Sequence, residues 1–110
     1  MREAKIILPL NDNQGEPMET AHSRLQKTLC TEFGGFTAQN ATGGYVNQAG
    51  ETQIEDVTIY FIAIQFKDWP KMQNIARDLI DTTDQESIYL GQPNGCGVEF
   101  IDRNHISTAA

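Results

Sequence analysis

Three carboxylates gathered in one polar segment are the densest group of side chains in this sequence that could do chemistry. Glu51, Glu55 and Asp56 stand immediately before the apolar run 57–66. Paired carboxylates can transfer protons, and their oxygens can hold a divalent cation. A cation-binding loop alternates acidic residues more densely than this segment does. We therefore interpret it as a solvated loop and expect no metal.

The two histidines do not form a catalytic pair in the sequence. The segment 105–107 reads His-Ile-Ser and matches the H-x-[ST] spacing of two-histidine phosphoesterases, which need a second motif of the same kind. His22 does not supply it and falls in a predicted helix. Nothing in the sequence brings a histidine and a third, orienting group to Cys30 or Cys96. We expect both cysteines to be small buried hydrophobic residues, and we predict no catalytic residue.

The glycines do not form a phosphate-binding loop. Gly43-Gly44 and Gly95-x-Gly97 match neither G-x-G-x-x-G nor G-x-x-x-x-G-K-[ST]. Neither stands between a strand and the start of a helix, where a phosphate would be cradled. The sequence therefore predicts no cofactor.

The charge balance excludes one class of partner. Eight basic residues against fifteen acidic ones give a net charge of −7, which repels a phosphate backbone, so we expect no direct binding to nucleic acid. No run approaches the roughly 18 apolar residues that span a bilayer, and the N-terminus lacks the pattern of a signal peptide. We expect a cytoplasmic protein, in the host cytoplasm if a phage carries the gene, that does not bind a membrane.

The first half of the chain predicts a strand, a helix and a second strand. The apolar run 5–10 ends in turn residues, and Pro17 suits the first turn of a helix. The helix has one apolar stripe at spacings of three and four, formed by Met18, Ala21, Leu25, Leu29 and Phe33. Gly34 ends it in the left-handed conformation. A strand follows from residue 36, with the pair Gly43-Gly44 as an interruption or a close backbone approach.

The second half repeats the pattern. Residues 57–66 are β-branched and aromatic on both faces and predict a central strand. Asp68 predicts a helix N-cap with Pro70 in the first turn, and the helix ends near Asp81. Strands follow at 87–90 and 98–101, the last as a hairpin partner or a continuation.

This order predicts an α+β protein, a ferredoxin-like β-α-β-β-α-β two-layer sandwich with an antiparallel sheet and an extra C-terminal hairpin as an option. We expect one domain over residues 1–102 and a flexible C-terminal tail over 103–110.

The stretch 6–63, with its I-I-L-P-L-N-D-N-Q-G-E-P opening, F-G-G-F-T helix exit and later G-G-Y-V, resembles small bacterial and phage proteins of ferredoxin-like shape without an established activity. The order of elements is also similar to that of the PII signalling proteins, whose phosphate-binding basic residues have no counterparts in 42–56. The antibiotic-biosynthesis-monooxygenase-like proteins share the shape, and the resemblance implies dimers formed through the sheets.

Two classes of function fit these observations. The first is a non-enzymatic acidic binding protein, an inhibitor or accessory factor of a phage or mobile element that docks on a basic protein. Its predicted partner-binding residues are Tyr45, Asn47, Gln48, Glu51, Glu55 and Asp56. The second is a small-molecule-binding or cofactor-free enzymatic domain that uses the open sheet face as a pocket. The absence of a catalytic constellation favours the first class, so we expect a binding protein more than an enzyme.

Apolar residues on both sides of the central strand predict a covered open face. Helices can cover only one face of a two-layer sandwich, so the other meets water or a partner. We predict a homodimer or a ligand on that face. The candidate residues are Ile7, Tyr60, Ile62, Ile64 and Tyr89, although the sequence leaves open which set faces the helices.

Overall fold

The computed structural model describes residues 1–103; the predicted tail at 104–110, with His105, lies outside the described residues. The elements in chain order are β1 (Arg2–Pro9), α1 (Glu19–Phe33), β2 (Thr37–Val46), β3 (Thr52–Ile64), a 3-10 turn (Phe66–Asp68), α2 (Trp69–Thr82), β4 (Ser87–Gly91), a second 3-10 turn (Pro93–Gly95) and β5 (Val98–Asp102). Arg103, predicted to begin the tail, donates from Nη2 to the carbonyls of Thr83 and Gln85.

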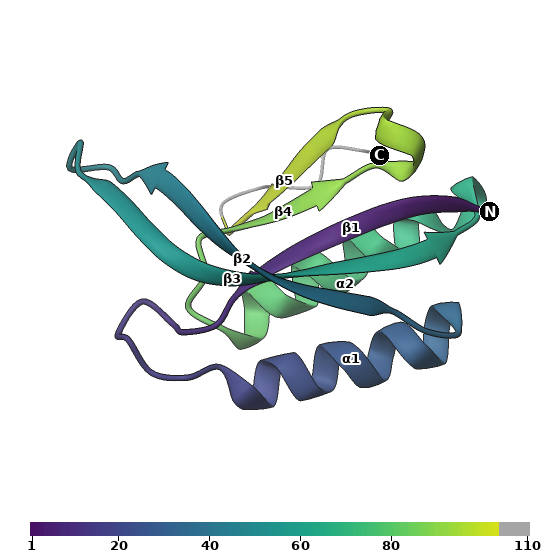
Figure 1. Ribbon diagram of the computed structural model, residues 1–110, viewed down its shortest axis with the longest axis horizontal. Coiled ribbons are helices and arrows are strands. Elements are labelled where there is room, and N and C mark those ends of the chain that lie inside the picture. The colour runs from purple at the N-terminus through teal and green to yellow at the C-terminus, as the bar shows by residue number, and fades with distance from the viewer. Residues whose placement is uncertain (104–110) are drawn as a thin grey trace.

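The strands form one antiparallel five-stranded sheet in the order β2-β3-β1-β4-β5. Figure 1 shows both helices on one side of this sheet and the hairpin of β2 and β3 reaching beyond them. The predicted ferredoxin-like α+β sandwich is confirmed. The optional C-terminal hairpin is present, because β5 returns beside β4 and not as its continuation.

The first helix follows its predicted stripe. Leu25 and Leu29 are buried, and Phe33 is partly buried against the core. Gly34 has φ 88° and donates its amide hydrogen to the Cys30 carbonyl, which is the left-handed helix end that the sequence predicts. The start of α2 differs from the prediction. Asp68 ends a 3-10 turn and makes no side-chain capping hydrogen bond, so the helix start relies on Pro70 in its first turn.

The hairpin of β2 and β3 is more regular than the sequence suggests. Its register runs without a break from Thr37 opposite Phe61 to Val46 opposite Thr52, so the glycine pair does not interrupt the strand. A Cβ on Gly43 would lie 3.3 Å from a Val57 methyl group, and one on Gly44 would lie 3.2 Å from Ile54 Cδ1. The predicted interruption is therefore wrong, and the glycine pair leaves room for the side chains of Val57 and Ile54.

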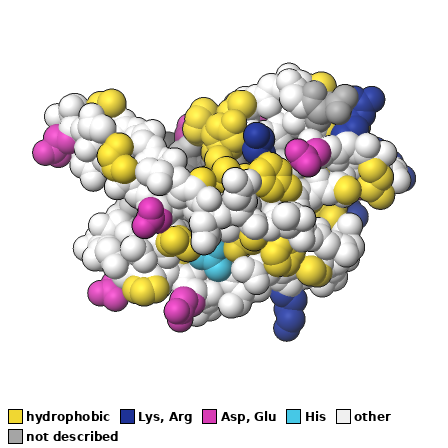
Figure 2. Space-filling view, viewed as in Figure 1, with side chains coloured by type: hydrophobic (Ala, Val, Ile, Leu, Met, Phe, Trp, Pro, Cys, Tyr) yellow, Lys and Arg dark blue, Asp and Glu magenta, His cyan; other side chains and the backbone are white. Residues whose placement is uncertain are grey.

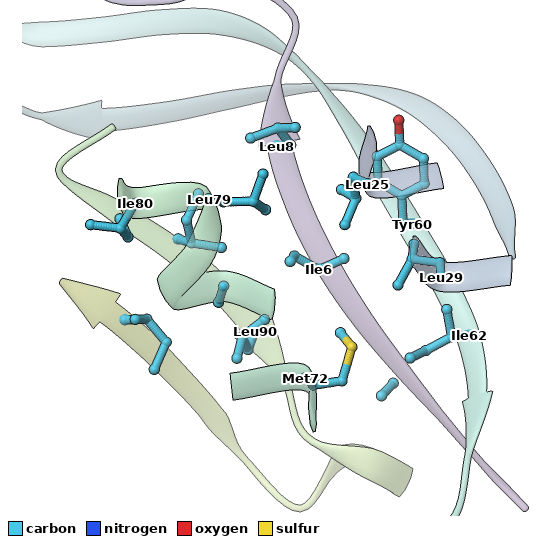
Figure 3. Packing of buried hydrophobic residues seen from close by; sticks show 14 of the residues in the cluster. Ile6, Leu8, Leu25, Leu29, Tyr60, Ile62, Met72, Leu79, Ile80 and Leu90 are labelled. Carbon is cyan, nitrogen blue, oxygen red and sulfur yellow. The ribbon is translucent and has the colours of Figure 1, made fainter. Parts of the chain in front are cut away.

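The core lies between the helices and the even-numbered residues of β1, β3 and β4. Ile6 and Leu8 point between Leu25 and Leu29 of α1 and Leu79 of α2 (Figure 3). The same layer takes up three of the residues predicted for the dimer or ligand face: Tyr60, Ile62 and Ile64. That assignment is corrected here, because the register places them opposite Ile6, Ala4 and Arg2 on the helix side.

Candidate functional site on the open sheet face

The face of the sheet away from the helices carries an apolar and aromatic surface. Strand alternation and the pairing register place on it Ile7 of β1, Ile59 and Phe61 of β3, Tyr89 of β4 and Phe100 of β5. We call these five residues the open-face cluster. Phe100 is 59% exposed, while the other four are partly buried. Ile7 and Tyr89 therefore lie where the sequence analysis expected them, on an apolar face without a helix.

The members of the cluster contact one another across neighbouring strands. Ile7 stands opposite Ile59 on one side and Tyr89 on the other. The rings of Tyr89 and Phe100 meet edge to face, with centroids 5.5 Å apart. Figure 2 shows hydrophobic side chains gathered in the region of β1 and β4 beside a basic side chain, with the outline of the molecule recessed between them and the projecting hairpin. Such a surface offers exposed aromatic rings that a ligand or a partner can contact.

One basic side chain stands inside this surface. Lys5 pairs with Phe61 and with Gly91, and its stem lies where a side chain on residue 91 would have to be, since a Cβ there would approach Lys5 Cγ to 2.6 Å. Its Nζ lies 5.9 Å from the centroid of the Phe61 ring. Among the residues that the structure describes, no carboxylate lies within ion-pair distance of Lys5. The face thus holds a cation whose counter-ion is not supplied by the fold.

The predicted partner-binding residues lie on the projecting hairpin. Asn47 forms the turn at its tip, where its Oδ1 accepts hydrogen bonds from the amides of Ala49 and Glu51. Tyr45 and Glu55 lie on the same side as the open-face cluster, whereas Asp56 lies on the opposite side. The hairpin therefore does not bring all six residues together. Asn47 and Glu55 are partly buried, and the other four predicted residues are exposed: Tyr45, Gln48, Glu51 and Asp56.

Glu55 is a carboxylate whose surroundings change its ionisation. Burial raises the pKa of the Glu55 carboxyl above its usual value of about 4.5. It precedes Val57, Ile59 and Phe61 on the same side of β3, so a titratable group lies at the hairpin end of the apolar surface. A perturbed carboxyl beside an apolar surface is a feature of functional sites.

A second polar cluster lies in the core and is complete in itself. His22 Nε2 lies 2.7 Å from the Pro9 carbonyl, and its Nδ1 lies 2.6 Å from the Tyr60 hydroxyl. A carbonyl only accepts, so Nε2 carries the proton and Nδ1 accepts from Tyr60. Gln26 Nε2 donates to the same hydroxyl at 3.1 Å. The pKa of Tyr60 is raised by burial, an effect that the Gln26 hydrogen bond partly opposes. His22 is the structural histidine that the sequence predicts.

Glu99 forms a third polar cluster that the sequence analysis missed. Its carboxylate accepts hydrogen bonds from Trp69 Nε1 at 2.5 Å, Gln73 Nε2 at 2.9 Å and Gln92 Nε2 at 3.2 Å. These donors come from α2 and from the loop after β4, so Glu99 ties β5 and that loop to the helix layer. With three donors on one carboxylate, the cluster is satisfied without a ligand.

Two hollows on the helix side have no aromatic side chain in their lining. A groove of about 310 Å³ between α1 and α2 is crossed by the ion pair of Lys71 and Glu32, with 3.7 Å between nitrogen and oxygen. A second hollow of about 430 Å³ is lined by Asp12, Glu19 and Asp84 among others. Both are therefore weaker candidates than the open face.

Three smaller features concern the cysteines, metal-ligating side chains and the length of the helices. Cys30 and Cys96 are free and exposed, so the expectation that they are buried was wrong. Within residues 1–103, no group of three or more metal-ligating side chains comes together. No helix in that part of the chain is long and apolar enough to cross a membrane.

The protein is an antiparallel ferredoxin-like sandwich whose helices leave one aromatic face of the sheet uncovered. No family model matches the chain, and no curated protein matches its sequence. Among solved structures, the chain is similar to a phage SAM lyase in the apo state, with a TM-score of 0.70 and 19% identity over 96% of this chain and 91% of that one. It is also similar to a phage SAM lyase in complex with S-methyl-5′-thioadenosine, with a TM-score of 0.67 and 19% identity over 91% of this chain and 88% of that one.

These similarities overturn the function favoured by the sequence. Two solved structures that share the fold over 96% and 91% of this chain are of a phage SAM lyase, which is an enzyme and not an inhibitor. The expectation of a non-enzymatic binding protein was therefore wrong, as was the expectation that enzymatic activity is absent. The reasoning failed because it took the lack of a recognisable catalytic constellation in the sequence as evidence against an enzyme.

Proposed function

We propose that this protein is an enzyme that cleaves S-adenosylmethionine in a lyase reaction and that the substrate binds on the open sheet face. The observation that supports the proposal most is the likeness to the lyase that holds S-methyl-5′-thioadenosine, which extends over 91% of this chain. The chain also has the surface such a ligand requires, since a thioadenosine is a flat purine joined to a sugar and a thioether.

S-adenosylmethionine and S-methyl-5′-thioadenosine differ in one fragment, and this difference identifies the bond that breaks. Removing the four-carbon amino-acid fragment from the sulfonium of S-adenosylmethionine leaves S-methyl-5′-thioadenosine. The bond between sulfur and the γ carbon breaks, and its electron pair stays on sulfur, which becomes a neutral thioether. A lyase adds no water, so the γ carbon must close onto a group of the same fragment, or the fragment must lose a proton and form a double bond. Neither route requires a metal or a protein nucleophile.

An apolar surface suits this change of charge. The positive charge on sulfur disappears as the bond breaks, so surroundings that solvate a cation poorly raise the energy of the substrate more than that of the transition state. The aliphatic side chains of Ile7 and Ile59 supply such surroundings, and the rings of Phe61, Tyr89 and Phe100 can stack on the adenine.

The overall charge of the chain favours the same substrate. S-adenosylmethionine carries a sulfonium, an ammonium and a carboxylate, for a net charge of +1, and the protein carries −7. Attraction between opposite charges speeds encounter, and it weakens once the uncharged thioadenosine has formed. The acidic composition therefore has a role in substrate capture as well as in solubility.

The open face also bears on assembly and location. A ligand lying on an uncovered sheet would keep one side in water, and a second copy that covers the face remains our proposal for the predicted homodimer. Light scattering at micromolar concentration would then report a particle heavier than the 12.3 kDa chain.

Exposed free thiols at Cys30 and Cys96 support a reducing compartment, so we propose that the enzyme acts in the cytoplasm, of the host if a phage carries the gene. That the hairpin residues also bind a basic protein stays a prediction.

The proposal is tested by incubating the purified protein with S-adenosylmethionine and separating the products by liquid chromatography with mass detection. We expect S-methyl-5′-thioadenosine to appear, and the mass of the four-carbon product will distinguish ring closure from formation of a double bond. Failure to release any thioadenosine, by protein shown to be folded, would contradict the proposal.

A matched pair of variants locates the reaction. Phe100→Ala removes a ring of the open-face cluster, and Phe66→Ala removes a ring of similar exposure outside the strands, at 58% against 59%. Stacking of a base on an aromatic side chain contributes about 1–3 kcal/mol, so we expect Phe100→Ala to lower kcat/KM by about tenfold and Phe66→Ala to leave it unchanged. Equal losses in the two variants would exclude the open face.

A further inference from the structure

Two side chains of opposite charge stand side by side on the open face at the beginning of β1. Glu3 and Lys5 are two residues apart, so both point away from the helices, with about 7 Å between their Cα atoms. Glu3 pairs with Ala63 and Lys5 with Phe61, so both side chains flank the apolar surface. Within the described part of the chain, neither makes an ion pair with the other or with a third residue.

Lys5 is held on the open face with its charge unpaired. Its side chain is partly buried, its stem lies over Gly91, and its Nζ lies 5.9 Å from the centroid of the Phe61 ring. Because no carboxylate of the described residues lies within ion-pair distance, the ammonium can pair with an anionic group of a ligand.

The amino-acid end of the proposed substrate carries both complementary charges. Its carboxylate and its ammonium are attached to the same carbon, and a lysine and a glutamate at adjacent positions on one side of a strand can reach both. The adenosine end would then extend from Phe61 along Ile59 and Tyr89 toward Glu55, which lies six residues from Phe61, or about 20 Å along β3. A strip of that length, shortened by the reach of the side chains at its two ends, accommodates one extended molecule of this kind.

We infer that Lys5 binds the carboxylate of the substrate and Glu3 binds its ammonium, so that these two residues fix the direction in which the substrate lies on the open face and select for an intact α-amino acid end. This inference rests on the proposed function. It makes Glu3 and Lys5 specificity-determining residues, and it places the sulfonium over the apolar part of the face. The arrangement also leaves the product thioadenosine without its two charged contacts, which favours its release.

Two ligands that share the thioadenosine part isolate the contact. S-adenosylhomocysteine keeps the carboxylate and the ammonium and does not react at a sulfonium, whereas S-methyl-5′-thioadenosine lacks the amino-acid fragment. Isothermal titration of both ligands against the wild type and Lys5→Met therefore separates the amino-acid contact from binding of the adenosine. Methionine keeps the unbranched apolar stem over Gly91 and removes the charge. Lys27→Met on the exposed face of α1 is the control for the change in net charge.

We expect Lys5→Met to weaken S-adenosylhomocysteine by about tenfold, as for a lost charge-assisted hydrogen bond, and to leave S-methyl-5′-thioadenosine within about twofold. Lys27→Met should change neither by more than about twofold, and Glu3→Gln should act in the same direction as Lys5→Met. An unchanged affinity for S-adenosylhomocysteine in Lys5→Met, or an equal loss for both ligands, would overturn the inference while cleavage by the wild type still upheld the proposed function. A wild type that neither cleaves S-adenosylmethionine nor binds either ligand would overturn both.

Discussion

Both faces of the sheet are rich in apolar residues, but their polar groups differ in whether they have partners within the fold. On the helix side, Tyr60 and His22 are buried and every polar atom of the pair has a partner within the fold. On the open side, Lys5 and Glu55 lie among apolar side chains, and no partner from the described residues neutralises either charge. A face that satisfies its own polar groups is structural, and a face that does not is a candidate for a ligand.

The contrast predicts opposite responses to the loss of an apolar side chain, and this is the largest expected effect. Leu29→Ala leaves a cavity in the core and should destabilise the protein by about 2–5 kcal/mol. Phe100→Ala removes a ring that is already mostly in water and should cost less than about 1 kcal/mol, while lowering activity. Chemical denaturation measures both. A loss in Phe100→Ala as large as that in Leu29→Ala would mean that the open face is part of the core.

The buried polar cluster should be the next most sensitive feature. Tyr60→Phe keeps the ring and removes the hydroxyl that donates to His22 and accepts from Gln26, leaving the histidine nitrogen buried without a partner. The expected loss in the free energy of unfolding is about 1–3 kcal/mol. Ligand binding should stay unchanged because Tyr60 points away from the open face. Wild-type stability in Tyr60→Phe would show that the cluster is not structural.

The tip of the hairpin should tolerate change. Asn47 closes the turn through its own side chain, and the tip is joined to the body only through the two strands. Replacing residues 47–50 by a short Asn-Gly turn should therefore keep Tm within a few degrees, as measured by circular dichroism. A large fall in Tm would assign the tip a structural role.

Glu55 gives the smallest predicted effect and a definite sign. Because burial raises the pKa of its carboxyl, the folded state holds the proton more tightly than the unfolded state does. Stability due to this group is complete below about pH 4.5 and is lost as the pH rises through the raised pKa. Glu55→Gln should thus match the wild type in acid and unfold at a slightly higher temperature at pH 7. A variant less stable at pH 7 would indicate that the charged form makes a favourable contact.

Much of the fold follows from local patterns in the sequence. The stripe of α1, the left-handed Gly34 and the β-branched run of β3 each specify their element through near neighbours, and the order of elements then leaves few topologies. The boundaries were less predictable. β3 begins at Thr52 and not at Val57, because pairing with β2 extends the strand through polar residues that have no strand pattern of their own.

The site was predicted only in part, because strand register is a tertiary property. Ile7 and Tyr89 could be placed on an apolar face, but the sequence alone did not show that Ile7 pairs with Ile59, and so Tyr60, Ile62 and Ile64 were assigned to the wrong side. One residue shift in register exchanges every side chain between the faces. Lys5 carried a usable signal that was missed, because it is a charged residue within the otherwise apolar segment 4–8 of the first strand.

The proposed enzyme binds the thioadenosine on the open sheet face. Titration of ¹⁵N-labelled protein with S-methyl-5′-thioadenosine, followed by amide chemical shifts, tests it residue by residue. We expect the largest shifts at Lys5, Ile59, Phe61 and Tyr89, and no shift at residues such as Thr28 and Asn74 that line the groove between α1 and α2. Shifts confined to the helix groove, with the open face unaffected, would contradict the account.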